Sequence, residues 1–298
     1  QKRFGLIPGI TDKSYITKVI KLFKDSKAKG YPLYAVVAPS ISGQFGEVTT
    51  GQVVAGMKQM GFTTVIEAAL GADLVAYQEG KELVEKGFLT SSCCPAFVSY
   101  IHKNFPMLVP NISHNLSPMA MIAKMIKRAH PDSKIVFVGP CVAKKGEIKQ
   151  ERVRELVDVT ITFEELQALF DSRDIDITQL QEDVLDNASY FGRIFPRCGG
   201  LSDAVAEGLK ENGITNFELK ACACDGIEEC RQALLKKKVN RLDANFIEGM
   251  ACVGGCIGGA GCLTHGEKNR TEVDKYGKEA FEKTISSSIS QLGKLNKK

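Results

Sequence analysis

The chain has 298 residues, of which 44% are hydrophobic and 25% are charged, and its formal net charge is +4. This composition is that of a globular protein with one large or two smaller cores, which argues against disorder. Lysine and arginine are spread along the chain and do not form a block, so nucleic-acid binding has no support. No apolar run reaches the roughly 20 residues of a membrane-spanning helix, and no signal peptide is recognisable, so we expect a cytoplasmic protein with no membrane partner.

Short β-branched runs alternate with amphipathic stretches along the chain. The predicted strands are Tyr34–Ser40, Thr63–Glu67, Lys134–Gly139, Phe217–Cys222 and Phe246–Ala251. Apolar residues at three- and four-residue spacing predict helices at Gly51–Gly61, Leu74–Lys86, Met119–Ala129, Phe163–Asp171 and Glu228–Lys237. This alternation predicts an α/β protein with mainly parallel sheets flanked by helices. Because no linker or internal repeat divides the chain, we expect residues 1–298 to form a single domain with two lobes.

The final segment, Glu267–Lys298, is polar and rich in lysine. Phe281, Ile285, Ile289 and Leu292 recur in it at roughly helical spacing. The segment therefore predicts a closing helix that packs through one face.

Ten cysteines are the unusual feature of the composition. Structural disulfides are rare in a reducing cytosol, so metal or redox chemistry becomes the leading interpretation of part of this set. Free cysteines are also among the most buried residues, and we expect core packing for those outside the motifs. These are Cys198, Cys222, Cys224, Cys230 and Cys262. A second metal site at Cys222, Cys224 and Cys230 is the alternative interpretation.

Three segments place cysteines in turns: 90–97 (TSSCCPAF), 139–147 (GPCVAKKGE) and 248–259 (EGMACVGGCIGG). A cubane iron–sulfur cluster needs four converging thiolates, and the carboxyl ends of parallel strands can gather them from distant segments. Gly254 and Gly255, between two of the cysteines, would let the backbone wrap around one cluster. Structural zinc more often uses two Cys-x-x-Cys pairs, which the sequence lacks. A cysteine nucleophile would need a histidine base, and no local signature supplies one.

The three segments resemble, in the same order, the three cysteine motifs of [FeFe] hydrogenases, and matching stretches run from about Tyr34 to Gly261. The resemblance implies an H-cluster domain in which a [4Fe–4S] cluster between the two lobes is joined to a diiron unit carrying CO, cyanide and azadithiolate. It implies that the cubane ligands are Cys94, Cys141, Cys252 and Cys256, the last as the bridge. It also implies that Lys144 and the backbone around Pro39 and Ser40 hold the cyanides, and that Met250 packs over the diiron unit.

The resemblance further implies a proton relay, because hydrogen evolution needs protons at a site that excludes bulk water. Cys93 matches the non-ligating cysteine that exchanges protons with the amine of the diiron unit. Glu79, Glu82 and Lys86 lie three and four residues apart on one face of a predicted helix, and Ser113 falls at the hydroxyl position of the pathway. A solvated helix face is the competing interpretation of Glu79 and Glu82.

Several positions depart from the best-known catalytic members. Gly139 replaces a common methionine and is expected to open space near the diiron unit, and Lys86 stands where arginine is common. Ser92 is an additional residue in the first motif, Phe97 replaces tryptophan, and residues 260–262 replace a more glycine-rich ending. These differences imply a divergent subgroup.

The resemblance implies reversible interconversion of two protons and two electrons with H₂. No Cys-x-x-Cys-x-x-Cys run occurs, so we expect no N-terminal ferredoxin-type cluster domain and an external electron donor such as ferredoxin. Maturation enzymes would build the diiron unit, and protein made without them would carry the cubane alone. Two alternatives stay open: a hydrogen sensor of low turnover, and an iron–sulfur assembly relative without a diiron unit.

Overall fold

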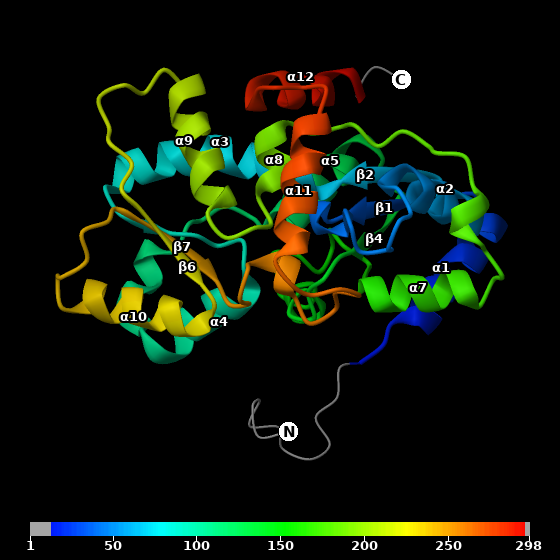
Figure 1. Cartoon of the computed structure of the whole chain (residues 1–298), viewed down its shortest axis with the longest axis horizontal. Coiled ribbons are helices and arrows are strands. Elements are labelled where there is room, and N and C mark those ends of the chain that lie inside the picture. The colour runs from blue at the N-terminus through cyan, green and yellow to red at the C-terminus, as the bar shows by residue number, and fades with distance from the viewer. Residues whose placement is uncertain (1–12, 296–298) are drawn as a thin grey trace, which may run out of the picture.

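The computed structural model describes residues 13–295 as two parallel sheets surrounded by helices (Figure 1). The first sheet has the order β2-β1-β4-β5, formed by Thr64–Glu67, Leu33–Val37, Lys134–Val138 and Val159–Ile161. The second has the order β3-β7-β6, formed by Leu89–Thr90, Phe246–Met250 and Ala221–Asp225. Every strand pairing is parallel. The predicted fold class, with two lobes of parallel sheet, is confirmed.

Helices cover both sheets. The longer ones are α1 (Ile16–Lys29), α2 (Thr50–Met60), α3 (Ala68–Lys86), α4 (Pro95–Asn104), α5 (Pro118–Ala129), α7 (Phe163–Asp171), α9 (Gly200–Glu211), α10 (Ile227–Lys238), α11 (Lys268–Glu279) and α12 (Ile285–Leu295). The shorter ones are η1 (Pro39–Ile41), η2 (Pro106–Asn111), α6 (Lys144–Glu147), η3 (Ile177–Gln179), α8 (Tyr190–Ile194) and η4 (Cys256–Gly258). No helix between residues 13 and 295 is long and apolar enough to cross a membrane.

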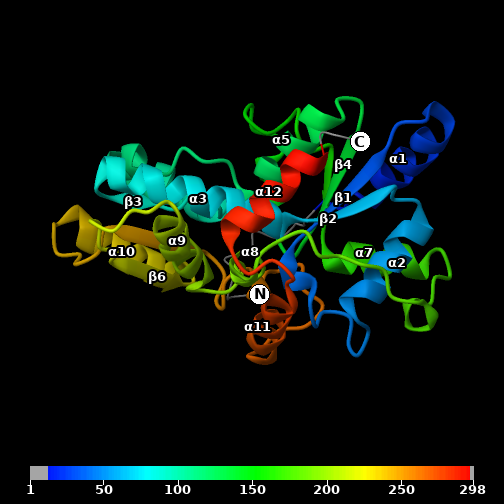
Figure 2. The ribbon, with the colours of Figure 1, turned by 90° about the horizontal axis from the view of Figure 1, so that it is seen from above.

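Helix α3 connects the two lobes. It begins directly after β2 of the first sheet and ends at Gly87, shortly before β3 of the second. It packs against α5, α8, α9 and α12, and in the view from above it runs between the two sheets with α12 nearby (Figure 2). The first nine residues of α3 are all buried, so this helix forms part of the core of both lobes.

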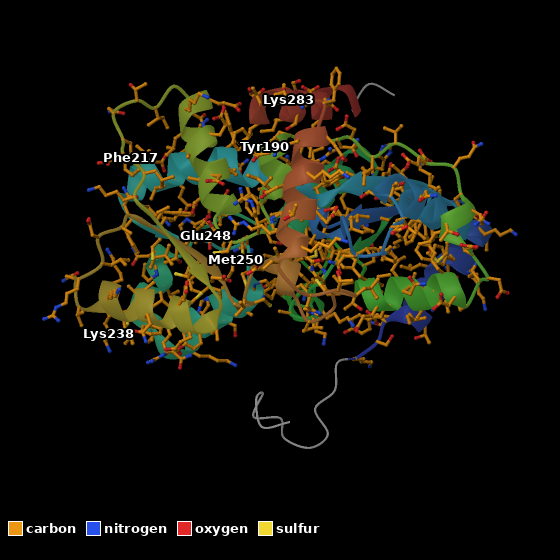
Figure 3. All side chains as sticks on the ribbon, viewed as in Figure 1. Tyr190, Phe217, Lys238, Glu248, Met250 and Lys283 are labelled. Atoms are coloured by element: carbon orange, nitrogen blue, oxygen red, sulfur yellow. The ribbon has the colours of Figure 1, made fainter. Side chains whose placement is uncertain are left out.

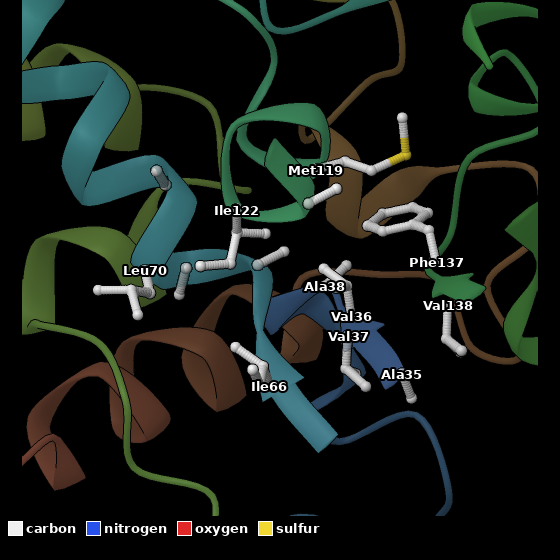
Figure 4. Close-up of a cluster of buried hydrophobic side chains, with 14 of the residues drawn as sticks. Ala35, Val36, Val37, Ala38, Ile66, Leu70, Met119, Ile122, Phe137 and Val138 are labelled. Carbon is white, nitrogen blue, oxygen red and sulfur yellow. The ribbon is translucent and has the colours of Figure 1, made fainter. Parts of the chain in front are cut away.

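The core of the first lobe surrounds β1, whose five residues, Leu33–Val37, are all buried. A strand covered on both faces is expected to be a continuous apolar run, and this one is. Figure 4 shows Leu70 of α3 and Ile122 of α5 packed beside this strand. The strand ends at Val37, and the amide of Ala38 donates to the carbonyl oxygen of Val138 on β4 at 2.9 Å, so the start of the following segment is held against the sheet.

Two sequence expectations need correction. The strand predicted at 217–222 is found at Ala221–Asp225, because pairing with β7 begins only at Ala221 and Phe246. The closing segment forms two helices, α11 and α12, and Ile285 and Leu292 are buried as predicted. Phe281 lies between the two helices and is 79% exposed, so its predicted packing is wrong. Residues 1–12 and 296–298, which belong to the predicted single domain, lie outside the described residues.

Candidate active site

The carboxyl ends of strands from both sheets meet at one cavity between the lobes. β1 leads into Pro39, and β4 leads through Gly139 and Pro140 into Cys141. From the second sheet, β3 leads into Cys93 and Cys94, and β7 ends at Met250. The cavity is lined by Ala38, Pro39, Ala68, Ala72, Cys93, Cys94, Pro95, Pro118, Met119, Phe137, Pro140, Cys141, Lys144, Phe195, Pro196, Met250 and Cys256.

Three of the four predicted cubane ligands, Cys94, Cys141 and Cys256, line this cavity. Burial raises the pKa of Cys141 to about 11, and the neighbouring Cys94 and Cys252 add to the rise. Burial, followed by the proximity of Cys141, Cys94, Cys93 and Cys252, raises the pKa of Cys256. The fold therefore gathers these thiols closely enough to affect one another. Metal binding there must displace their protons.

The loop 251–259, called here the cluster loop, carries Cys252 and Cys256. Gly254 and Gly255 both have φ of +83°, the conformation for which glycine was expected between the two cysteines. A Cβ atom on Gly255 would lie 2.6 Å from the carbonyl oxygen of Pro196. The amide of Cys256 donates to that same oxygen at 2.7 Å. Glycine is therefore required for the loop to pack this closely against residue 196.

Among residues 13–295, no group of three or more His, Cys, Asp or Glu residues is arranged to hold a single metal ion. A zinc ion holds each sulfur at about 2.3 Å, whereas a cubane distributes its four thiolates over separate irons. Four thiolates on separate irons remain the chemistry that the cysteine motifs predict.

Lys144 is a buried cation at the wall of the cavity. Its Nζ donates to the carbonyl oxygen of Cys93 at 3.2 Å and forms an ion pair with Glu147 at 2.5 Å. Burial opposes its charge, but Glu147 and nearby cysteines raise the pKa of Lys144 overall. The lysine therefore stays cationic and suits an anionic ligand in the cavity.

Met250 and Pro39 also line the cavity, and Glu248 lies two residues before Met250 on β7 (Figure 3). Ser40 is fully buried, and its Oγ has no hydrogen-bond partner. An unpaired buried hydroxyl is costly, so this donor next to Pro39 fits a polar group bound in the cavity.

The expectation that Gly139 opens space is wrong. A Cβ atom on Gly139 would lie 2.7 Å from the ring of Phe137 and 3.1 Å from Cβ of Ala38. Phe137 lines the cavity, and Figure 4 shows its ring near Met119 and Ala38. The phenylalanine ring fills the space that a side chain at position 139 would occupy.

The inner part of the predicted relay is deeply buried. Cys93 lines the cavity, and burial followed by the charge of Glu79 raises the pKa of its thiol. Glu79 is fully buried and neither carboxylate oxygen makes a hydrogen bond. Burial raises its pKa to about 8, although the nearby Ser113 hydroxyl and Ser92 amide offset part of the rise. Near neutral pH, Glu79 can therefore hold a proton inside the protein.

The outer part of the relay is polar and connected. Glu82 accepts a hydrogen bond from Ser113 at 3.0 Å and pairs with Lys86 at 2.8 Å. Partial burial raises the pKa of Glu82, but Lys86 and the backbone and hydroxyl donors lower it overall. The structure thus brings the five predicted relay residues into one region, ordered from the cavity toward the surface.

Sequence reasoning missed the groups that hold this outer part. Asn115 donates to Glu82 through its side chain at 3.0 Å, and the amide of His114 does so at 3.0 Å. Arg152 donates to the carbonyl oxygen of Asn115 at 2.8 Å, and the additional Ser92 donates to the same oxygen at 2.8 Å. Glu147, the ion-pair partner of Lys144, was also missed, although two residues three apart on a helix are a recognisable spacing.

The cysteines outside the motifs fall into two groups. Cys224, Cys230 and Cys262 are buried, which confirms core packing for them. Cys198 and Cys222 are half-buried. The alternative metal site at Cys222, Cys224 and Cys230 finds no support within residues 13–295.

The family model described as iron only hydrogenase large subunit, C-terminal domain, matches residues 31–260. That range includes every candidate site residue. The chain belongs to the iron-only hydrogenase large-subunit family.

Members of this family and its relatives match over different extents. The periplasmic [Fe] hydrogenase large subunit of Nitratidesulfovibrio vulgaris is 27% identical, over 84% of this chain and 72% of that protein. Iron hydrogenase 1 of Clostridium pasteurianum is 26% identical over 90% of this chain, which spans only 56% of that protein. The cytosolic Fe-S cluster assembly factor NAR1 of Botryotinia fuckeliana is 34% identical, over 41% of this chain and 25% of that protein.

The fold agrees with the family. The [FeFe]-hydrogenase HydA1 from Chlamydomonas reinhardtii matches with a TM-score of 0.77 at 20% identity, over 95% of this chain and 94% of that one. At this identity the likeness supports the two-lobed hydrogenase fold alone.

Proposed function

We propose that this chain is an [FeFe] hydrogenase that interconverts protons and electrons with H₂. The observation that carries the proposal is the single cavity between the lobes, onto which Cys93, Cys94, Cys141, Cys256 and Lys144 all open. A site for cluster assembly alone has no need of a buried lysine and a non-ligating cysteine at the same cavity.

The residues present fit an H-cluster. Cys94, Cys141, Cys252 and Cys256 would hold the [4Fe–4S] cluster, and Cys256 would bridge to the diiron unit. Lys144 and, next to Pro39, the hydroxyl and backbone amide of Ser40 would bind the anionic cyanide ligands, and the unpaired Ser40 hydroxyl is a donor available for that task. When bound, the diiron unit supplies the metal at which protons are reduced and H₂ is oxidised.

The protein's own residues would deliver the protons. Cys93 would exchange a proton with the cavity, and Glu79, with a pKa of about 8, would resupply Cys93 from the buried side. Ser113 donates to Glu82, whose other partner is Lys86 near the surface. The apolar lining, which includes Phe137 and Met250, would exclude bulk water.

Electrons would enter from an external donor such as ferredoxin. Cys252 is half-buried and its neighbour Val253 is 74% exposed, so the cluster loop reaches the surface. Electron transfer to the cubane therefore has a short route at this face. Maturation enzymes as suppliers of the diiron unit, and a cytoplasmic location, are part of the same proposal.

The ligand set is tested by anaerobic reconstitution with iron and sulfide. Cys94→Ala and Cys256→Ala are expected to lose most of the iron and the absorbance of the cluster. Cys222→Ala, which changes a half-buried cysteine on β6, is the matched control and should bind as much iron as the unaltered chain. Unchanged iron content in both ligand variants would contradict the assignment.

An iron–sulfur assembly relative is the second candidate, because the NAR1 match is 34% identical. Infrared spectroscopy after loading with a synthetic diiron precursor separates the two functions. A hydrogenase should show CO and cyanide stretching bands that persist through desalting, and an assembly relative should show none. Bands with negligible turnover would instead favour the hydrogen sensor.

A further inference from the structure

Three cysteines lie together on the second lobe, away from the cavity. Cys222 and Cys224 occupy alternate positions of β6, and Cys230 lies in the first turn of α10. Alternate residues of a strand point to the same face. The Sγ atoms of Cys222 and Cys224 are 3.9 Å apart, whereas Cys230 donates to the carbonyl oxygen of Met250 at 3.5 Å.

We propose that Cys222 and Cys224 form a reversible disulfide, which makes β6 a redox-sensitive modification site distinct from the candidate active site. The proposal does not depend on hydrogenase activity. It concerns a pair of thiols for which neither the cluster nor the proton relay has a use.

Strand geometry places the pair within reach of a bond. With a rise of about 3.3 Å per residue, the Cα atoms of alternate residues lie about 6.6 Å apart, near the upper end of the roughly 4.4–6.8 Å that disulfides span. The Sγ atoms must close from 3.9 Å to about 2.05 Å, which requires β6 to bend locally. β6 is an edge strand paired only with β7, so no strand on its other side opposes that bend.

The same geometry explains why the bond would be reversible. A disulfide at the limit of the Cα range is strained, and strained disulfides are more easily reduced than relaxed structural ones. The site would therefore respond to the thiol–disulfide balance of its surroundings.

The surroundings favour this pair over other partners. Cys222 is half-buried and accessible to a reagent, whereas Cys224, two residues along the same strand, is 1% exposed. Cys230 is fully buried, and it lies close enough to Cys224 to raise the pKa of that thiol, but its own thiol donates to the carbonyl oxygen of Met250.

The oxidant is a small-molecule disulfide, R–S–S–R. The Cys222 thiolate, having lost its proton to solvent, attacks one sulfur of the oxidant, and the released R–S⁻ takes a proton to become R–SH. Cys224 then loses its proton and attacks the Cys222 sulfur, which forms the intramolecular bond and releases a second R–SH. Two protein thiols are oxidised by two electrons, and one disulfide is reduced to two thiols.

The test uses the full chain with its cubane reconstituted, equilibrated anaerobically with oxidised glutathione and then alkylated and digested with trypsin. Cleavage after Lys220 and Arg231 places all three cysteines in one peptide. The expected product is this peptide with one alkyl group, on Cys230, and a mass two hydrogens lower for the internal bond. Dithiothreitol should restore three alkylation sites.

Matched variants make the result decisive. Cys222→Ser and Cys224→Ser should each lower the fraction of internally bridged peptide at least tenfold, and Cys230→Ser should leave it unchanged. A peptide that keeps three alkylation sites at a large excess of oxidant, or a bridge that includes Cys230, would overturn the proposal. Because the hydrogen bond with Cys224, followed by burial, raises the pKa of Cys222, bridging should also be faster at pH 9 than at pH 7.

Discussion

Two glutamates one turn apart on α3 are driven to opposite ionisation states by their surroundings. Burial raises the pKa of Glu79 to about 8, whereas Lys86 and several hydrogen-bond donors lower that of Glu82. A proton therefore resides more readily on the inner carboxyl than on the outer one. Pairs of titratable groups separated in this way are typical of acid–base sites.

Replacing Cys93 tests the inner end of the relay. Cys93→Ala should leave iron content unchanged and lower hydrogen evolution by about 10²-fold or more, because it removes a proton-transfer group and no ligand. The measurement is turnover per cluster with a reduced viologen as donor. Activity equal to that of the unaltered protein would refute the role of Cys93.

Replacing Glu79 should lower turnover but raise stability at high pH. Glu79→Gln should lower turnover by about 10²-fold, because the amide carries no transferable proton at this position. Since the carboxyl has a folded pKa of about 8 against a usual 4.5, its stabilising contribution is complete below pH 4.5 and is lost as the pH rises through about 8. The variant should therefore unfold at a higher temperature than the unaltered chain at pH 9.

The exposed Glu85, on the same helix, supplies the control. Glu85→Gln should change neither turnover nor the pH dependence of the unfolding temperature. If Glu79→Gln and Glu85→Gln behave alike, Glu79 is not the buried proton carrier.

At the scale of elements, the approach of α3 to α5 depends on a residue without a side chain. A Cβ atom on Gly71 would lie 2.1 Å from the carbonyl oxygen of Pro118 and 3.2 Å from Cβ of Ile122. The first neighbour is backbone and cannot rotate away. The two helices are therefore held at a distance that only glycine allows.

Gly71→Ala should lower the free energy of unfolding by at least about 1–3 kcal/mol, the usual cost of overpacking a core. Chemical denaturation monitored by circular dichroism measures it. Gly146→Ala is the matched control, because nothing lies within 4 Å of its added Cβ atom. Equal stability of the two variants would show that the helices separate at little cost.

Sequence patterns located the buried strands more accurately than the exposed ones. β1, β4 and β7 were predicted within about two residues at most ends, because buried parallel strands are continuous apolar runs. β6, with the sequence ACACD and a single buried position, was predicted four residues too early at its start and three at its end, and the two-residue β3 has no pattern to detect. The start of α3 was also missed, since a run beginning at Ala68 that is buried on all sides shows no amphipathic period.

Some residues of the candidate site could be recognised from the sequence and others could not. The cysteine motifs, Lys144 and Met250 were recognisable from local sequence, and the fold brings all of them except Cys252 to the wall of one cavity. The contacts of Asn115 and Arg152 with the relay segment depend on tertiary proximity between distant parts of the chain, which no local pattern encodes. Phe137 is only two residues from Gly139, but it was missed because the direction of its ring depends on packing and not on local sequence.

At the scale of the whole molecule, one buried carboxyl joins helices from three parts of the chain. Asp73 of α3 accepts hydrogen bonds from the amide and hydroxyl of Ser189, at 2.8 and 2.6 Å, and from the hydroxyl of Ser288 on α12 at 2.6 Å. Burial raises its pKa to about 7, against a usual 3.8. The attachment of α8 and α12 to the helix that spans both lobes is therefore sensitive to pH.

The sign of this effect can be tested with Asp73→Asn. Between pH 3.8 and about 7 the folded state binds more protons than the unfolded chain, so the stabilising contribution of Asp73 is complete below pH 3.8 and is lost as the pH rises through about 7. Three pKa units correspond to at most about 4 kcal/mol. In unfolding curves measured over a pH series, the variant should lack the loss of stability that the unaltered chain shows as the pH rises through about 7.

Asp183→Asn is a control whose effect on the pH dependence of stability should have the opposite sign. The hydrogen bond from Lys58 lowers the pKa of Asp183, so its small contribution is present above the unfolded pKa and is lost on acidification. Difference curves of the same sign for the two variants would contradict the assignment of Asp73.

The central claim is that the cavity between the lobes operates as a hydrogenase active site. The most direct measurement is hydrogen evolution from reduced viologen by anaerobic protein with a rebuilt cubane and a diiron unit loaded from a synthetic precursor. We predict rapid evolution that depends on Cys93. Negligible evolution despite full iron loading and intact CO and cyanide bands would contradict a catalytic role and leave the same site as a sensor.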